Sequence, residues 1–113
     1  MEEMLEAYIR YLVAEKNLSG YTLRNYRSDL RHFAAWLDEN EGTPMLEADR
    51  MSLRRYLGEL KGSGMATGSM ARKVSSIRSF FKFLVREGKL ETSPLTGIVA
   101  QAREEAAHDP FPR

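Results

Sequence analysis

Hydrophobic residues recur every three or four positions in four segments of this chain, and no segment shows the strict alternation of a half-buried strand. This spacing gathers the apolar side chains on one side of a helix with 3.6 residues per turn. It predicts helices over about residues 3–16, 19–40, 49–61 and 66–87. We therefore expect an all-α fold, a compact four-helix bundle followed by a flexible C-terminal linker.

Residues at the predicted helix ends support these ranges. Ser19 and Asp49 can each accept a hydrogen bond from an unpaired amide of the turn that follows. Gly42 tolerates the left-handed backbone at a helix end, and the Gly-Ser-Gly run at 62–64 and Gly88 are expected to end the third and fourth helices. A chain of 113 residues fits one core. We expect one domain over residues 1–95, with an interdomain linker or disordered tail over 96–113.

The apolar sides of the four helices predict the core. Their members are Met4, Leu5, Tyr8, Ile9, Leu12 and Val13, then Leu23, Tyr26, Leu30, Phe33 and Leu37, then Leu53, Tyr56, Leu57 and Leu60, then Met70, Val74, Ile77, Phe80, Phe81, Leu84 and Val85. Trp36 projects off this side of the second helix, and we expect the first or fourth helix to cover it. Phe83 falls inside the polar side of the last helix, which predicts packing against a neighbouring helix or the tail. His32 is expected at the surface.

The polar sides of the second and last helices share one make-up, in which arginine or lysine alternates with serine, threonine and asparagine. On the second helix this side comprises Tyr21, Arg24, Asn25, Ser28, Arg31 and His32, with Thr22 at its margin. On the last helix it comprises Ser69, Arg72, Ser75, Ser76, Arg78, Ser79, Lys82 and Arg86, with Lys73 at the edge of the apolar side. Such side chains contact phosphates and the edges of bases, and an α-helix fits the major groove of DNA.

Charge is unevenly distributed along the chain, although its net value is only +1. Residues 61–89 hold seven cations and one acid, whereas residues 38–49 hold five acids and no cation. A solvated helix also turns charges and serines outward, so the polar sides alone leave a plain surface role open. The scarcity of acids on the last helix favours a polyanionic partner, because ordinary exposed helices mix both signs.

Several classes of function are not supported by this sequence. The chain has no cysteine, which excludes thiolate catalysis and cysteine-bound zinc. The two histidines, His32 and His108, lie far apart, so we expect no metal and no cofactor, and no motif indicates catalytic residues. Since no apolar run approaches a membrane span and the N-terminus lacks the features of a signal peptide, we expect a soluble cytoplasmic protein.

Two stretches resemble a known family. The run LSGYTLRNYRSDLRHFAAWL at 18–37 resembles the second helix of the N-terminal core-binding (SAM-like) domain of tyrosine recombinases, the phage-integrase and Xer-type recombinases. The run KVSSIRSFFKFLVREGKLETSPL at 73–95 resembles the last helix of that domain. Val74, Ser75, Ser76, Ile77, Arg78, Phe80 and Phe81 match the family pattern, and Pro94 falls where the domain ends. The resemblance covers about residues 3–98.

The resemblance implies a mechanism in which this domain and a separate C-terminal catalytic domain clamp duplex DNA, with the second and fourth helices in the major groove. The DNA contacts it implies are Ser19, Tyr21, Thr22, Arg24, Asn25 and Ser28 on the second helix and Ser69, Arg72, Lys73, Ser76 and Ser79 on the fourth. Arg78 matches a recurrent family arginine, for which a structural role and a phosphate contact are both open. Lys82 and Arg86 lie beyond the contact half and are expected to be solvated cations.

The family's catalytic tyrosine and its arginine and histidine partners have no counterpart here, so we expect a chain that binds DNA but does not cleave it, and that is monomeric alone. Its expected partners are double-stranded DNA, the catalytic domain and other recombinase protomers. A helical module that binds an acidic protein and a small stand-alone DNA-binding regulator are the alternatives. The two-sided last helix also predicts that Arg72→Ala weakens DNA binding with little change in melting temperature, while Ile77→Ala costs about 2 to 5 kcal/mol of stability.

Overall fold

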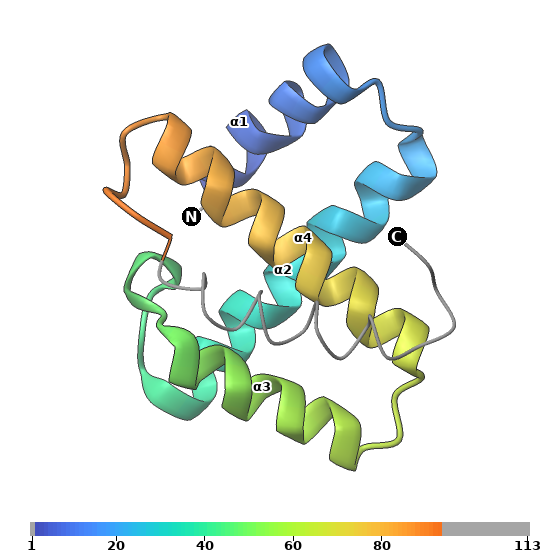
Figure 1. Ribbon diagram of the computed structural model, residues 1–113, viewed down its shortest axis with the longest axis vertical. Helices are drawn as coiled ribbons and strands as arrows, with labels where there is room; N and C mark the ends of the chain where they lie inside the picture. The colour runs from blue at the N-terminus through green and yellow to red at the C-terminus, as the bar shows by residue number, and fades with distance from the viewer. Residues whose placement is uncertain (1, 94–113) are drawn as a thin grey trace.

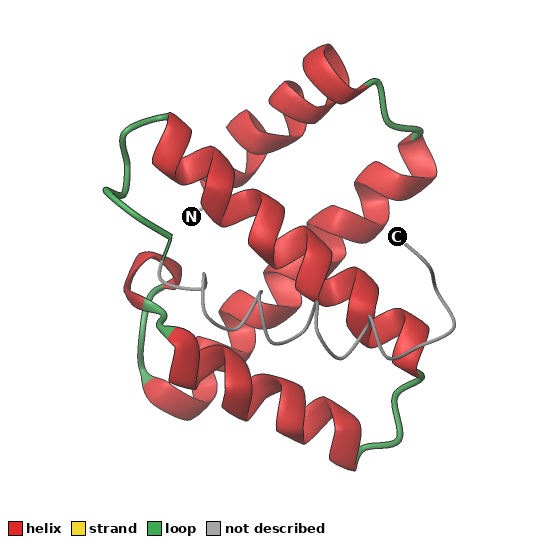
Figure 2. Ribbon diagram, viewed as in Figure 1, coloured by secondary structure: helices red, strands yellow, loops and turns green. Residues whose placement is uncertain are grey.

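The computed structural model describes residues 2–93, which form helices and their connections with no strand in that range. The order is α1 (Glu2–Tyr11), a π-helix η1 (Leu12–Lys16), α2 (Gly20–Glu41), a short 3-10 helix η2 (Met45–Glu47), α3 (Arg50–Gly62) and α4 (Thr67–Arg86) (Figures 1 and 2). The predicted all-α, four-helix fold is confirmed. The predicted linker at 96–113 lies outside the described residues.

Both ends of α2 and the start of α3 form as the sequence predicts. The Ser19 hydroxyl accepts a hydrogen bond from the Thr22 amide at 3.2 Å, which caps α2. Gly42 ends α2 with a φ of 59°, in the left-handed region that glycine adopts without a Cβ clash. Asp49 and Ser52 exchange hydrogen bonds in a capping box at the start of α3. These local contacts fix both ends of α2 and the start of α3.

We expect Asp49→Ala to lower the free energy of unfolding by about 1 kcal/mol, because it removes the N-cap of α3. The hydrogen bond from the Ser52 amide holds the pKa of Asp49 below its usual value. The stabilisation is therefore present above the pKa of the unfolded state and is lost as pH falls through the lower folded value. Urea unfolding at neutral and acidic pH measures both effects. Asp38→Ala removes an exposed carboxylate of α2 that makes no described contact, and it serves as the control.

The end of the first helix differs from the prediction. Beyond Tyr11 the backbone continues as the π-helix η1, which ends at Asn17 with a φ of 52°. A π-turn holds more residues than an α-turn, so side chains after Tyr11 rotate away from the face that a regular helix would give them. Leu12 remains buried, but Val13, predicted in the core, is 52% exposed. The prediction for Val13 was therefore wrong.

The helices cross around one core. Figure 1 shows α4 lying across α2, with α1 on one side of the crossing and α3 on the other. Tyr8, Phe33, Tyr56, Phe80 and Phe81 are completely buried there. This crossing brings α2 and α4 into direct contact.

Two aromatic residues that the helical pattern left uncertain pack against neighbouring helices. The ring of Phe83 packs against those of Tyr8 and Tyr11 of α1, at centroid distances of 5.5 and 5.2 Å, which confirms packing against a helix. Trp36 was expected under the first or fourth helix, and this expectation was wrong. Its ring instead packs 5.4 Å from that of Tyr56 in α3, because the second half of α2 lies against α3. His32 is exposed, as predicted, and its Nδ1 lies 2.6 Å from the Tyr56 hydroxyl.

Candidate nucleic-acid interface

A buried carboxylate fastens α2 to α4. Asp29 of α2 is completely buried, and the guanidinium of Arg72 donates to both of its oxygens, from Nε at 3.0 Å and from Nη2 at 2.8 Å. The Lys73 ammonium lies 3.1 Å from Oδ1, and the Ser76 hydroxyl lies 3.3 Å from Oδ2. Two cations and a hydroxyl thus satisfy one carboxylate, which sets the crossing of the two helices.

This cluster changes the surface that the sequence predicts for α4. Ser76 was placed on the solvent side of the helix, but its side chain is completely buried. Lys73, at the edge of the predicted apolar side, is only 7% exposed. Neither presents a free polar group to solvent, because α2 covers both. A DNA contact by either residue stays a prediction and requires the Asp29 cluster to rearrange.

Arg72 both binds the buried Asp29 and is accessible from solvent. Its side chain is 40% exposed, so it can be reached from solvent while it remains bound to Asp29. The hydrogen bonds to Asp29 raise the pKa of the guanidinium, which keeps it charged. The expectation that Arg72→Ala leaves the melting temperature nearly unchanged does not fit this geometry. Removing the guanidinium takes two of its hydrogen bonds from a buried carboxylate, so a loss of stability is expected as well.

The first half of α2 presents an exposed polar surface beside Arg72. Tyr21 is 68% exposed, and the Arg24 guanidinium lies 6.0 Å from the centre of its ring. Ser28 is exposed one turn beyond Arg24. Asp29, in the same half of α2, binds Arg72 and Lys73, which places this half of α2 next to the first turns of α4. No acid occurs between Gly20 and Ser28.

The cations of α2 differ in how they are paired. Arg27 binds Glu6 of α1 at 3.1 Å, and Arg31 binds Glu2 at 2.7 Å. Both therefore contribute to holding α1 in place, and Arg31, predicted on the polar side, is partly neutralised. Arg24 has no acid within ion-pair distance anywhere in residues 2–93. It is consequently the α2 arginine with the largest unbalanced charge.

The remaining predicted contact residues differ in exposure and in the groups they contact. Ser19 and Thr22 are exposed or half-buried at the start of α2, where their hydroxyls bond to one another at 3.1 Å. Asn25 and Ser69 are half-buried on the first halves of α2 and α4. Ser79 accepts a hydrogen bond from the Tyr8 hydroxyl at 2.7 Å. It thus faces α1, about two turns further along α4 than Arg72.

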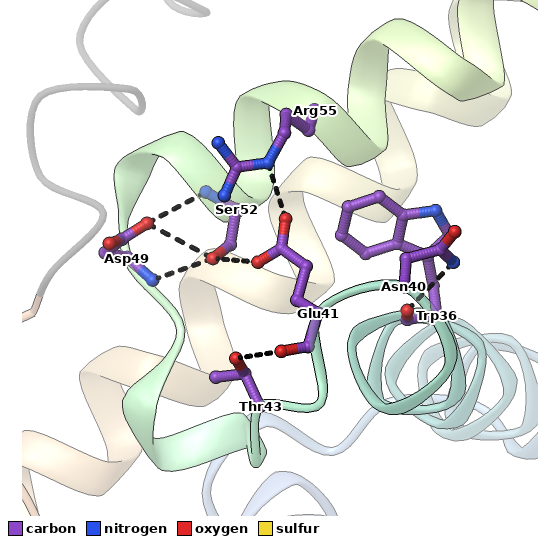
Figure 3. Close-up of polar contacts among 7 residues, drawn as sticks. All are labelled: Trp36, Asn40, Glu41, Thr43, Asp49, Ser52 and Arg55. Atoms are coloured by element: carbon purple, nitrogen blue, oxygen red, sulfur yellow. Dashed lines mark hydrogen bonds and ion pairs between the residues drawn. The ribbon is translucent and has the colours of Figure 1, made fainter.

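The opposite end of α2 is acidic, and its side chains are hydrogen-bonded to the start of α3 (Figure 3). The Glu41 carboxylate accepts hydrogen bonds from the Ser52 hydroxyl at 2.8 Å and from Arg55, and Asp49 caps α3 beside them. The hydrogen bond from Arg55 lowers the pKa of Glu41, and residues 38–49 hold five acids and no cation, so this end is negative at neutral pH. A polyanion would be repelled here. The candidate interface is therefore the other end of α2 together with the outer side of α4.

Neither a cluster of metal ligands nor a membrane-spanning helix occurs in the described part of the chain. Among residues 2–93 no group of three histidines or acids is placed to hold a metal ion. No helix in the same range is long and apolar enough to cross a membrane.

Asp29 is the residue whose role sequence reasoning missed. It is the single acid of the basic segment 17–37, and it falls on the side of α2 between the apolar and polar faces. An isolated acid among cations is a usable signal for an internal ion pair. Its partners could not be identified, because the crossing of α4 over α2 is not encoded in either helix alone.

Comparison with known proteins places this all-helical domain in a family. The family described as "Phage integrase, N-terminal SAM-like domain" matches residues 5–88, and the chain belongs to it. The similar proteins are tyrosine recombinases. XerC of Syntrophus aciditrophicus is 35% identical over 105 residues, which are 87% of this chain and 34% of that protein. XerD of Chlorobaculum tepidum is 39% identical over 94 residues, 83% of this chain and 31% of that protein.

A third relative matches a larger share of the chain. XerC of Pelobacter propionicus is 37% identical over 105 residues, covering 91% of this chain and 34% of that protein. The chain thus spans about a third of the length of these relatives. No solved structure matches it.

Proposed function

We propose that this chain is the DNA-binding part of a site-specific tyrosine recombinase and holds duplex DNA with α2 and α4 in the major groove. The observation that carries the proposal is the pair of acid-free exposed surfaces on the first halves of these helices, held side by side by Asp29. A major groove accommodates an α-helix, and arginine with serine or asparagine supplies contacts to phosphates and base edges.

The two cations best placed for such contacts act differently. Arg24 is exposed and free of acidic partners in the described chain, so it can move to a phosphate or a guanine edge. Arg72 is held by Asp29 through two of its nitrogens, which fixes its direction before DNA arrives. A fixed guanidinium loses less conformational entropy on binding than a free one. Both lie in the first halves of their helices, where the helix dipole also favours phosphate.

The wider activity belongs to the parent recombinase. DNA strand breakage and rejoining, and hence DNA integration and recombination, would be performed with a C-terminal catalytic domain and other recombinase protomers. This domain would act in the cytoplasm, where its DNA substrate lies, and would be monomeric by itself. Its contribution is to hold the DNA on the side opposite the catalytic domain.

The proposal is tested by titrating a mixed-sequence duplex of about 20 base pairs with the chain at low and at physiological salt. We expect weak binding whose affinity falls steeply as salt rises, because phosphate contacts release condensed counterions. Fluorescence anisotropy of labelled DNA measures it. Failure to bind at the lower salt concentration would contradict the proposal.

We expect Arg24→Gln to weaken DNA binding about tenfold and to lower the slope of log affinity against log salt by about 1, if the residue contacts a phosphate. The melting temperature should not change, because Arg24 makes no ion pair in the described chain. The control is Arg54→Gln, which removes an exposed cation from α3 without touching the candidate interface. If both substitutions lowered DNA affinity equally, the affinity would depend on net charge alone and the candidate interface would not be supported.

A further inference from the structure

A basic groove lies between the end of the first helix and the second half of α4, apart from the surface around Arg72. Its volume is about 490 Å³. Lys16 of η1 and Arg78, Lys82 and Arg86 of α4 line it. The rings of Tyr11 and Phe83 also line it and pack 5.2 Å apart, joining the two walls.

The charge in this groove is unbalanced. No acid lines it, and Lys16, Arg78 and Lys82 have no acidic group within ion-pair distance in the range 2–93. The fourth cation, Arg86, lies 3.6 Å from Glu15 and stacks 4.8 Å from the centre of the Tyr11 ring. Gathering four cations around one groove raises the electrostatic free energy of the folded chain. An anionic ligand would remove that cost, which makes the groove a candidate anion site.

The cations are arranged in a row. Arg78, Lys82 and Arg86 follow one another at intervals of four residues, so they rise by about 6 Å per step along one side of α4. Lys16 faces them from η1. The π-turn makes this possible, since it changes the direction in which side chains after Tyr11 project. An extended anion fits such a row better than a single small one.

Building on the proposed DNA-binding function, we propose that this groove holds the phosphate backbone of the duplex beside the segment read by α2 and by the first half of α4. Lys82 lies about 15 Å along the helix axis from Arg72. The major groove is about 12 Å wide, which is less than this distance. When the first turns of α4 lie in the groove, its second half therefore lies beside the phosphate backbone of the flanking strand. The expected solvated cations Lys82 and Arg86 thus become positioning contacts, which carry no sequence information.

The test uses the double substitution Lys16→Gln with Lys82→Gln in the complete chain. Both side chains are exposed and make no ion pair within the described residues, so folding should be unaffected. The matched control is Arg50→Gln with Arg54→Gln, which removes two exposed cations from α3. Anisotropy titrations with a duplex of about 20 base pairs at several salt concentrations give the affinity and its salt slope for each protein.

We call the chain with Lys16→Gln and Lys82→Gln the groove variant. We expect it to bind DNA at least about tenfold more weakly than the unsubstituted chain at about 0.1 M salt, with a salt slope smaller by about 2. The loss should be the same for duplexes of different sequence, because phosphates carry no base identity. A loss no greater than that of the control overturns the groove proposal. If that happens while Arg24→Gln still weakens binding, the proposed function stands. If the unsubstituted chain does not bind DNA, both fail.

The same variants distinguish DNA from an acidic protein segment as the ligand of the groove. Polyglutamate stands in for an acidic protein segment in a second set of titrations. Loss of polyglutamate binding by the groove variant, with its DNA affinity and salt slope unchanged, would assign the groove to an acidic protein and overturn the DNA proposal.

Discussion

Asp29→Ala is expected to lower the free energy of unfolding by about 3 to 5 kcal/mol, since breaking a buried ion pair leaves an uncompensated charge. Lys73 is the partner most affected, because it is 7% exposed and binds no other acid among the described residues. Arg72 loses its bidentate partner but can turn toward water. Ser76 keeps only its hydrogen bond to the Lys73 carbonyl, at 3.0 Å. Urea unfolding followed by circular dichroism measures the loss.

The control for Asp29 is Asp38→Ala, in the same helix but exposed, which should change stability by no more than about 0.5 kcal/mol. A second variant, Asp29→Ala combined with Lys73→Met, removes the stranded buried cation and should recover part of the loss. No recovery in the double variant, or a loss for Asp29→Ala as small as that for Asp38→Ala, would contradict the ion-pair explanation.

The Asp29 cluster also bears on function, because it joins the two helices proposed to enter DNA. The relative angle of α2 and α4 decides whether Arg24 and Arg72 can reach the same groove. A cluster of directional hydrogen bonds specifies that angle more sharply than apolar contact does. Removing the acid Asp29 makes the net charge more positive, which by itself would strengthen DNA binding. A folded variant without Asp29 should nevertheless bind DNA more weakly than the unsubstituted chain, because α2 and α4 are no longer held at the same angle.

Features encoded within one helix could be predicted from the sequence. The caps at Ser19 and Asp49 depend on the residue and its next three neighbours, and the structure confirms both. The apolar sides of α2 and α4 depend on helical spacing, and Phe33 and Ile77 are completely buried as expected. These features needed no knowledge of how the helices pack.

Features that depend on two helices at once could not be predicted. Ser76 lies on the polar side of α4 by rotation, yet α2 crosses that position and buries it. Trp36 is covered by α3, because a projection gives the direction of a side chain but not the helix that meets it. The groove containing Lys16 depends on a π-turn that periodicity does not reveal. The candidate contacts on α2 stay predictions of the resemblance until DNA binding is measured.

Ile77→Ala is expected to lower the free energy of unfolding by about 2 to 5 kcal/mol, because it removes buried methyl groups and leaves a cavity. The side chain is completely buried in the core. Ser75→Ala, two residues earlier and exposed, is the matched control on the same helix and should change stability by about 0.5 kcal/mol or less. Thermal and urea unfolding of the variants give the comparison.

Substitutions on the two sides of α4 should also differ in their effect on DNA affinity. Ile77→Ala should leave DNA affinity unchanged at temperatures where the variant is folded, because no part of its side chain reaches the surface. Arg72→Ala should reduce both stability and DNA affinity, since the guanidinium binds Asp29 from an exposed position. If Ile77→Ala were no more destabilising than Ser75→Ala, the assignment of the buried side of α4 would be wrong. If Arg72→Ala lowered stability alone, its guanidinium would serve the helix crossing and Arg24 would remain the cation that meets DNA.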